Sequence, residues 1–210
     1  MSKKLDAVVI GAGASGLAAG YYLRRSGLRF KILEAAAEPG GSWPHYYESL
    51  RLFSPGRYSS LPGFPFPGEP EEYPSRDEVT EFLRLYARYF RLPVESGQRV
   101  ERVEREGGRF AVHTAPGDKF NAGSVIVATG AFNEPYLPEL RGQDEFEGEV
   151  LHSASYREPE TFRGKRVVVV GAGNSAIQIA VELTSVADVS LATRGPIPFR
   201  PQRLLGKDIH

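Results

Sequence analysis

Two glycine-rich segments have the residue types and spacing that bind dinucleotides. Residues 11–16 read Gly-Ala-Gly-Ala-Ser-Gly after the apolar run 5–10, and residues 171–176 read Gly-Ala-Gly-Asn-Ser-Ala after the run 166–170. Each copy follows a β-branched run and opens a helical pattern, the context in which this motif binds a pyrophosphate. The first glycine permits a tight turn, the second lets the backbone approach the anion, and the helix N-terminus faces it. Two such segments predict two dinucleotides and electron transfer between them.

The residue that ends the next strand indicates which ligand the first motif takes. The predicted strand 29–33 ends at Glu34, 23 residues beyond Gly11. A carboxylate at this place accepts hydrogen bonds from a ribose diol and repels a phosphate, so the first site suits FAD or NAD. The alternative is that Glu34 is an ordinary solvated charge at a strand end.

The corresponding residue after the second motif is basic. The predicted strand 189–193 ends at Arg194, 23 residues beyond Gly171. A guanidinium there suits the 2′-phosphate of NADP, where a carboxylate would repel it. Ala176, in place of a third glycine, also fits an NADP site. Here too the alternative is a solvated strand-end charge.

Composition agrees with a globular enzyme and excludes several other classes. Hydrophobic residues make up 41% and charged residues 25% of the chain, and the formal net charge is +0, which gives no indication of nucleic acid or an anionic membrane. No apolar run approaches the roughly 20 residues of a membrane span. Residues 1–4 lead directly into the first strand and leave no room for a signal peptide, so we expect a cytoplasmic protein. With no cysteine, the redox-active dithiol of thioredoxin-reductase-type flavoenzymes is excluded.

The segment between the motifs reads as one interrupted domain. We expect one helix over about 15–26, ended by Gly27, and a second, amphipathic helix from 76 or 77 to 90. The stretch 50–74 has too many prolines for a helix or central strand, and its aromatic residues favour an ordered loop packed against something flat. The expected strands are a meander at 99–104, 110–114 and 119–121, then a buried strand at 124–128.

A longer motif carries a family resemblance. Residues 146–156 read Phe-Glu-Gly-Glu-Val-Leu-His-Ser-Ala-Ser-Tyr, which fits the pattern Phe-x-Gly-x-x-x-His-x-x-x-aromatic of the class B flavoprotein monooxygenases. Residues 128–130, Ala-Thr-Gly, match the segment that links the two domains in that family. The chain resembles flavin-containing monooxygenases, the plant YUCCA-type enzymes and, more distantly, Baeyer–Villiger monooxygenases. Tyr156 ends the motif as in flavin-containing monooxygenases, and the resemblance is greatest to their small bacterial relatives.

The resemblance implies an α/β fold and an activity. Residues 1–145 would form an FAD-binding, Rossmann-like three-layer ββα domain with the meander at about 99–121. Residues 146–210 would form a linker motif and the start of a second, NADP-binding Rossmann domain. The implied activity is that of an FAD-dependent, NADPH-using oxidoreductase of monooxygenase type, in which a flavin hydroperoxide oxygenates a small soft nucleophile. The partners are then a small-molecule substrate and oxygen, without metal, nucleic acid or membrane.

The resemblance also implies which residues hold each cofactor. Glu34 would bind the adenosine ribose, Val100 the adenine through its backbone, and Phe53 would lie near the isoalloxazine ring. The residues expected around FAD are Gly11, Gly13, Ala14, Ser15, Gly16, Glu34, Gly41, Ser42, Trp43, Phe53, Ser54, Val100, Ala128, Thr129 and Gly130. Those expected around NADP are Gly171, Gly173, Asn174, Ser175 and Arg194.

One departure from the family pattern concerns the chemistry. Flavin-containing monooxygenases place an asparagine beside the flavin, whereas the loop here reads Phe53-Ser54-Pro55 and no asparagine precedes Asn121. The oxygenating intermediate is therefore expected to be short-lived, and the enzyme to be uncoupled and release hydrogen peroxide as an NADPH oxidase does. No catalytic residue is assigned. Ser54 and His152 are candidates, and for His152 a structural role at the domain junction is favoured.

The second departure is length, because the family continues beyond the point where this sequence stops at His210. A truncated gene product or fragment is therefore expected. The alternative function is an FAD-binding module, or a remnant without turnover. The edge strand left exposed by such a remnant could pair with a second copy, so a homodimer is one expected assembly.

Overall fold

The computed structural model describes residues 4–132 and 134–209, and its contacts divide the chain into two compact units. The first unit comprises Met1–Pro44, Gly56–Glu72 and Asp77–Glu134, and the second comprises His45–Pro55, Tyr73–Arg76 and Pro135–His210. The second unit thus includes two short pieces from the N-terminal half of the sequence. The boundary at residue 145 stays a prediction, and residues 1–3, where no leader is expected, lie outside the described part.

Among residues 4–132 and 134–209, the helices are too short or too polar to cross a lipid bilayer.

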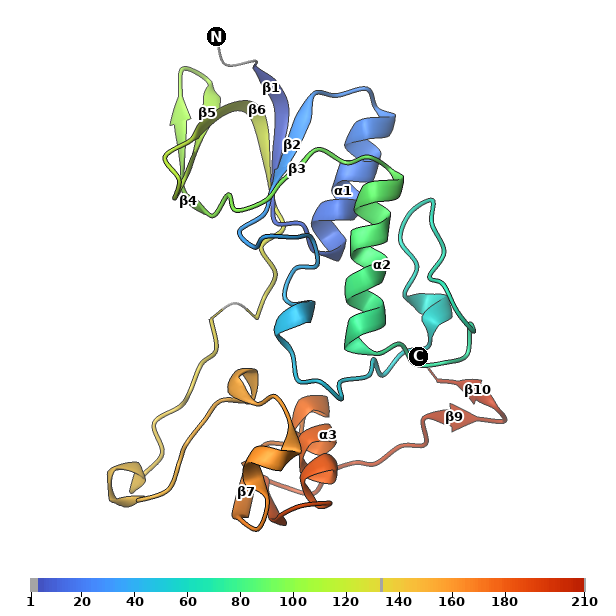
Figure 1. The fold of residues 1–210 in the computed structure, drawn as a ribbon, viewed down its shortest axis with the longest axis vertical. Helices are drawn as coiled ribbons and strands as arrows, with labels where there is room; N and C mark the ends of the chain where they lie inside the picture. The colour runs from blue at the N-terminus through green and yellow to red at the C-terminus, as the bar shows by residue number, and fades with distance from the viewer. Residues whose placement is uncertain (1–3, 133, 210) are drawn as a thin grey trace. The chain divides into compact units, whose positions relative to one another are not determined.

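The first unit is built on a six-stranded sheet in the order β3-β2-β1-β6-β5-β4 (Figure 1). Its strands are β1 (Leu5–Ile10), β2 (Phe30–Leu33), β3 (Val94–Glu95), β4 (Val100–Glu106), β5 (Arg109–Thr114) and β6 (Lys119–Val127). β1 pairs in parallel with β2 and with the second half of β6, and β2 pairs in parallel with β3. β4, β5 and the first half of β6 form the antiparallel meander. This mixed α/β sheet confirms the predicted fold class.

β6 corrects the prediction of two separate strands at 119–121 and 124–128. It is one strand whose first half pairs with β5 and whose second half pairs with β1. Gly123 lies where the partner changes, and a Cβ there would come within 3.0 Å of the Asp6 carbonyl oxygen, so this glycine permits the close approach of β1. The predicted burial of 124–128 is also wrong. Val125 packs against the core cluster, but Val127, at the end of the strand and beyond that cluster, is 71% exposed.

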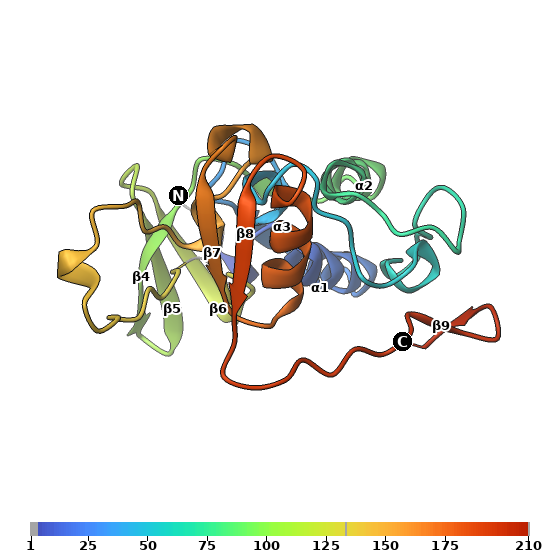
Figure 2. The same cartoon turned by 90° about the horizontal axis from the view of Figure 1, so that it is seen from below.

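Two helices of similar length lie side by side next to the parallel strands (Figures 1 and 2). α1 (Ala14–Arg25) buries Leu17, and the ring of Tyr21 on α1 meets that of Phe90 at 4.8 Å, just after the end of α2 (Arg76–Tyr89). α2 buries Val79, Phe82, Leu83 and Tyr86 on the apolar face that the spacing predicts, and Thr80 and Ala87 are buried as well. The helices are thus joined by aromatic contacts.

The proline-rich segment is ordered, as the sequence predicts. Phe64 lies 4.7 Å from the ring of Tyr89, and Phe66 lies 4.7 Å from the ring of Phe82. The Tyr86 hydroxyl donates a hydrogen bond to the carbonyl oxygen of Pro62 at 2.7 Å. The flat surface against which residues 56–72 pack is therefore the aromatic face of α2.

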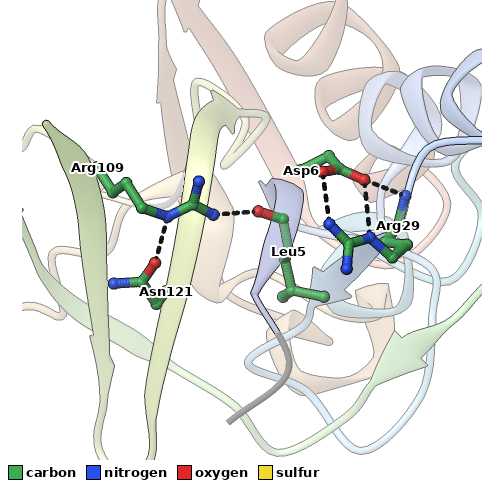
Figure 3. A network of polar contacts seen from close by, with 5 residues as sticks. All are labelled: Leu5, Asp6, Arg29, Arg109 and Asn121. Carbon is green, nitrogen blue, oxygen red and sulfur yellow. Dashed lines mark hydrogen bonds and ion pairs between the residues drawn. The ribbon is translucent and has the colours of Figure 1, made fainter.

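A polar network holds the N-terminal end of β1 between the elements on either side (Figure 3). Asp6 accepts hydrogen bonds from the backbone N–H of Arg29 at 2.8 Å and from its guanidinium at 3.1 and 3.2 Å. These bonds lower the pKa of the Asp6 carboxyl. On the other side, Arg109 donates to the Leu5 carbonyl oxygen at 2.6 Å and to the Asn121 side chain at 2.5 Å. The network ties β1 to its neighbours at the end opposite the first glycine motif.

The second unit pairs β7 (Arg166–Val170) in parallel with β8 (Asp188–Ala192), and α3 (Asn174–Leu183) connects them. This confirms the strand–helix–strand order predicted from the second motif. Tyr47, Tyr156, Ile179 and Leu183 form the buried core. β9 (Arg203–Leu204) and β10 (Lys207–Asp208) form a short antiparallel hairpin. Short 3₁₀ helices lie at η1 (Trp43–His45), η2 (Gly56–Tyr58), η3 (Gln143–Glu145), η4 (Ser153–Ser155) and η5 (Pro159–Phe162).

Candidate dinucleotide-binding sites

The first glycine motif forms the turn between β1 and α1. Gly11 has a φ of +103°, which favours glycine, and a Cβ there would lie 2.4 Å from the carbonyl oxygen of Ala128. A Cβ on Gly16 would lie 1.9 Å from the carbonyl oxygen of Gly11. Neither position accepts a side chain unless the backbone moves. The fold itself therefore requires these two glycines.

Gly13, between them, is not required by the fold. Its φ of −78° and ψ of −173° are open to any residue, and a Cβ would meet Gly41 Cα at 3.6 Å, an ordinary contact. Gly13 is the N-cap of α1, and glycine has no side chain to accept hydrogen bonds from the first N–H groups of the helix. A side chain would enter the space in front of the helix N-terminus, where an anion is favoured. The absence of a side chain at Gly13 is therefore explained better by a bound ligand than by packing within the protein.

The turn at residues 40–43 packs directly on the first motif. Gly41 has a φ of +58°, and a Cβ on it would lie 3.0 Å from Gly13 Cα. The N–H of Gly40 donates to the Ala12 carbonyl oxygen at 3.3 Å. The structure therefore brings this turn, whose residues 41–43 are expected near FAD, to the motif. Gly40, which is outside the set of residues expected near FAD, makes this contact with Ala12.

Glu34 is buried and belongs to the first motif, so its interpretation as a solvated charge is wrong. It follows β2 and is 7% exposed. One carboxylate oxygen accepts a hydrogen bond from the N–H of Ala12 at 2.6 Å, and the other accepts one from the N–H of Ala36 at 2.9 Å. A carboxylate oxygen accepts about two hydrogen bonds, so each oxygen keeps one place for a ligand hydroxyl.

The second motif repeats the geometry of the first. Gly171 has a φ of +130°, and Gly173 has a φ of −78° and a ψ of 170°, close to the angles of Gly13. A Cβ on Gly173 would have no neighbour within 4 Å among the described residues. α3 begins at the next residue, and both Asn174 and Ser175 are exposed in its first turn. The structure brings these four predicted residues together at one helix N-terminus.

Arg194 lies two residues beyond the end of β8 and is exposed. In parallel sheets this carboxyl end of a strand is the edge at which ligands bind. Its place therefore suits a contact to a ribose phosphate, while the solvated alternative stays open.

The remaining residues expected near FAD fall into two groups. Ala128 donates its N–H to the Ile10 carbonyl oxygen at 2.9 Å and so lies beside the first motif, with Thr129 and Gly130 following it. Val100 begins β4, is paired with Thr114 on β5, and packs its side chain against the core, while the contact of its backbone with adenine stays a prediction. By contrast, Phe53 and Ser54 belong to the second unit.

His152 caps a short helix. Its Nδ1 accepts a hydrogen bond from the N–H of Ala154 at 3.1 Å, at the start of η4. This bond supports the structural role favoured for His152 over a catalytic one.

The loop at Phe53 has a neighbour that the sequence did not indicate. The side-chain amide nitrogen of Gln202 donates to the Phe53 carbonyl oxygen at 2.8 Å and to Asp208 at 2.9 Å. Asp208 also accepts a hydrogen bond from the Tyr73 hydroxyl. Gln202 lies 149 residues from Phe53 in sequence, and no local pattern could predict this pairing.

A family model for pyridine nucleotide-disulphide oxidoreductases matches residues 8–203, nearly the whole chain. The chain belongs to this family. Its relatives also confirm the resemblance to flavin-containing monooxygenases. The family name includes disulphide chemistry, but these 210 residues contain no cysteine and so cannot supply a dithiol.

Three relatives illustrate the similarity. The oxidoreductase CzcO-like protein of Geobacillus kaustophilus is 38% identical over 209 residues, which cover 100% of this chain and 60% of that protein. A probable indole-3-pyruvate monooxygenase of Arabidopsis thaliana is 34% identical over 212 residues, covering 95% and 49%. The structure of a flavin-containing monooxygenase from Stenotrophomonas maltophilia is 46% identical with a TM-score of 0.91, covering 96% and 61%. The chain thus spans about 60% of the length of the first of these relatives.

The anchoring of Glu34 predicts a loss of stability in Glu34→Gln. An amide offers one oxygen and one NH₂ group, so one of the two backbone donors, on Ala12 or Ala36, would face another donor. We expect the free energy of unfolding to fall by about 1–3 kcal/mol, measured by chemical denaturation. Glu101→Gln, at an exposed position on β4, is the matched control and should change it by less than about 0.5 kcal/mol. Equal effects of the two substitutions would contradict the role of Glu34.

Proposed function

We propose that the first motif binds FAD. The observation that carries this proposal is the contrast within the motif: Gly11 and Gly16 are required by packing, whereas a Cβ on Gly13, the N-cap of α1, would make only an ordinary contact with Gly41 at 3.6 Å. A pyrophosphate suits this position because the first N–H groups of the helix face it. The buried carboxylate of Glu34 suits a ribose diol and disfavours a phosphate on it. Flavin-containing relatives favour FAD over NAD at this site.

We propose that the second motif binds NADPH. A Cβ on Gly173, the N-cap of α3, would have no neighbour within 4 Å among the described residues, and Arg194 provides a cation at the carboxyl end of β8. The name of the family, with its pyridine nucleotide, supports a nicotinamide cofactor. The guanidinium favours the 2′-phosphate of NADP over the free hydroxyl of NAD.

Together these sites support an FAD-dependent, NADPH-using oxidoreductase of monooxygenase type that acts on oxygen and a small molecule. When bound, the flavin supplies hydride acceptance and oxygen chemistry, and the protein supplies binding and orientation. The chain's own contribution is two uncapped helix N-termini for the pyrophosphates, the Glu34 carboxylate for one ribose and the Arg194 guanidinium for the other. No residue is assigned to proton transfer. A cytoplasmic location and a homodimer stay predictions.

An absorption spectrum of the purified chain tests this function. Flavin absorption that is bleached by NADPH supports the oxidoreductase. Flavin that NADPH does not bleach would support the alternative of an FAD-binding module without turnover, and absence of flavin would contradict both.

Gly13→Val should abolish flavin retention and leave the chain folded. Valine can adopt the backbone angles at this position, and its side chain would occupy the space of the pyrophosphate. The measurements are flavin absorption and circular dichroism of the purified variant. Gly173→Val is the reciprocal control, because it should retain flavin and lose NADPH binding. A Gly13→Val protein that holds as much flavin as the parent would show that the first site is wrongly assigned.

Arg194→Ala should raise the concentration of NADPH needed for half-maximal flavin reduction about ten- to hundredfold. The concentration of NADH needed should change little. Only the charge-assisted hydrogen bond to the 2′-phosphate, worth roughly 1.5–3 kcal/mol, would be lost. Titrations of flavin reduction with each coenzyme measure this. Arg166→Ala, at the other end of the β7–β8 pair, should affect neither coenzyme. If NADH suffers as much as NADPH, Arg194 has only a structural role.

Oxidation of NADPH should release about one hydrogen peroxide per NADPH consumed, because an oxygenating site must be dry and hold hydrogen-bond donors. The Phe53–Pro55 loop has Ser54 where the family has an amide, and the amide N–H groups of Gln202 that reach this loop are used by Phe53 and Asp208. Peroxide assays with sulfide, amine and indole substrates measure the yield. Ser54→Asn should lower it. Oxygenated product in near-stoichiometric amount would contradict uncoupling.

A further inference from the structure

Tyr47 links a loop from the N-terminal half of the sequence to the helix of the second motif. It lies four residues after Trp43 in sequence, yet belongs to the second unit and is 4% exposed. Its hydroxyl donates a hydrogen bond to the side-chain oxygen of Gln178 on α3 at 2.7 Å. Its ring packs against that of Tyr156, with centroids 5.9 Å apart.

Two hydrogen bonds determine the orientation of the Gln178 side-chain amide, which accepts one and donates the other. Its oxygen accepts from Tyr47, and its nitrogen donates to the backbone oxygen of Arg51 at 3.2 Å. The segment 47–51 therefore holds α3 through a side chain and a carbonyl. None of the residues expected around FAD or NADP takes part in these two hydrogen bonds.

The Tyr47 hydroxyl also faces the second motif itself. Ser175 lies three residues before Gln178, and residues three apart share one face of a helix. Burial raises the pKa of Tyr47, the charge of Glu182 adds to this, and a hydrogen-bonding influence of the Ser175 side chain opposes it. The hydroxyl thus stays protonated at neutral pH, and it bonds to the face of α3 that Gln178 shares with Ser175.

We propose that Tyr47 is a positioning residue for the second dinucleotide site. It holds the first turn of α3, and with it Asn174 and Ser175, where the N–H groups meet the pyrophosphate. This inference rests on the proposed NADPH site and adds a residue from outside its motif. The proposed effect of Tyr47 passes through Gln178 and the face of α3 that Gln178 shares with Ser175.

The physical reason is that α3 has a glycine N-cap and no side chain of its own to hold its first turn. An anion site made of backbone N–H groups depends on where those groups point, and small displacements weaken such contacts. The part-buried hydrogen bond from Tyr47 to Gln178, one turn along the same face of α3 as Ser175, supplies the missing restraint. Losing one hydrogen bond of ordinary strength corresponds to about a fivefold change in an equilibrium constant.

The test is Tyr47→Phe in the full 210-residue chain, with NADP⁺ as the probe. We expect the Kd for NADP⁺, measured by calorimetry, to rise about fivefold, while the flavin content stays that of the parent. Gln178→Leu should raise the Kd in the same direction. In the double variant, the Kd for NADP⁺ should rise by less than the product of the two single increases, since both substitutions remove the same hydrogen bond.

Tyr156→Phe is the matched control. The Tyr156 hydroxyl donates to Glu182 at 2.8 Å, on the same helix but seven residues beyond Ser175. The Tyr156→Phe substitution should lower the melting temperature as much as Tyr47→Phe does and leave the Kd for NADP⁺ unchanged.

An unchanged Kd in Tyr47→Phe, or an equal rise in Tyr156→Phe, overturns the positioning role while the parent still binds NADP⁺. A parent that binds no NADP⁺ overturns the proposed second site, and this inference with it.

Discussion

The contact between the backbone of the first motif and the end of β6 determines the geometry of the first unit. Gly11 passes so close to the Ala128 carbonyl oxygen, and Gly16 to the Gly11 carbonyl oxygen, that neither position has room for one methyl group. This approach directs the N-terminus of α1 at the carboxyl edge of the sheet. Glu34 reaches the same place from β2 and bonds to the N–H of Ala12. The strand order, the direction of α1 and the buried carboxylate of Glu34 are thus all related to the same turn between β1 and α1.

The two motifs share a backbone design but differ in their surroundings. Ala12 of the first motif is buried, and the turn at residues 40–43 packs over it, while Ala172 of the second is exposed. The strand-end residues differ in the same way: Glu34 is held by two N–H groups, and Arg194 is exposed. A carboxylate can be buried because backbone donors satisfy it, whereas a guanidinium meant for a phosphate gains from remaining accessible. On the proposed assignment, the second motif therefore has fewer contacts of its own that order it than the first motif has.

Local patterns predicted the parts of the fold that local physics controls. The glycine spacing, the β-branched runs and the apolar face of α2 gave both strand–turn–helix units because turn geometry and side-chain periodicity act over a few residues. The two-residue strand β3 was missed, and β6 was divided at Gly123, because strand pairing depends on distant partners. Tyr47 and Gln178 are 131 residues apart, and Gln202 and Phe53 are 149 apart, so only the folded chain reveals those pairings. The burial of Glu34 likewise followed from tertiary contacts.

The glycine caps of α1 and α3 have a consequence for the chain without its ligands. Each helix starts with N–H groups that no N-cap side chain satisfies, which leaves these groups for water or a bound phosphate. A ligand that binds only the ordered turn stabilises that turn, and the gain in free energy rises with the logarithm of the ligand concentration once this exceeds the Kd. Within these first turns, the N–H groups of Leu17 and Ile177 already bond to the carbonyl oxygens of Gly13 and Gly173. The amides of residues 14–16 and 174–176 are therefore the ones that report on whether each proposed site is occupied. Their exchange with solvent deuterium slows as each dinucleotide binds, and each site is read separately within one molecule.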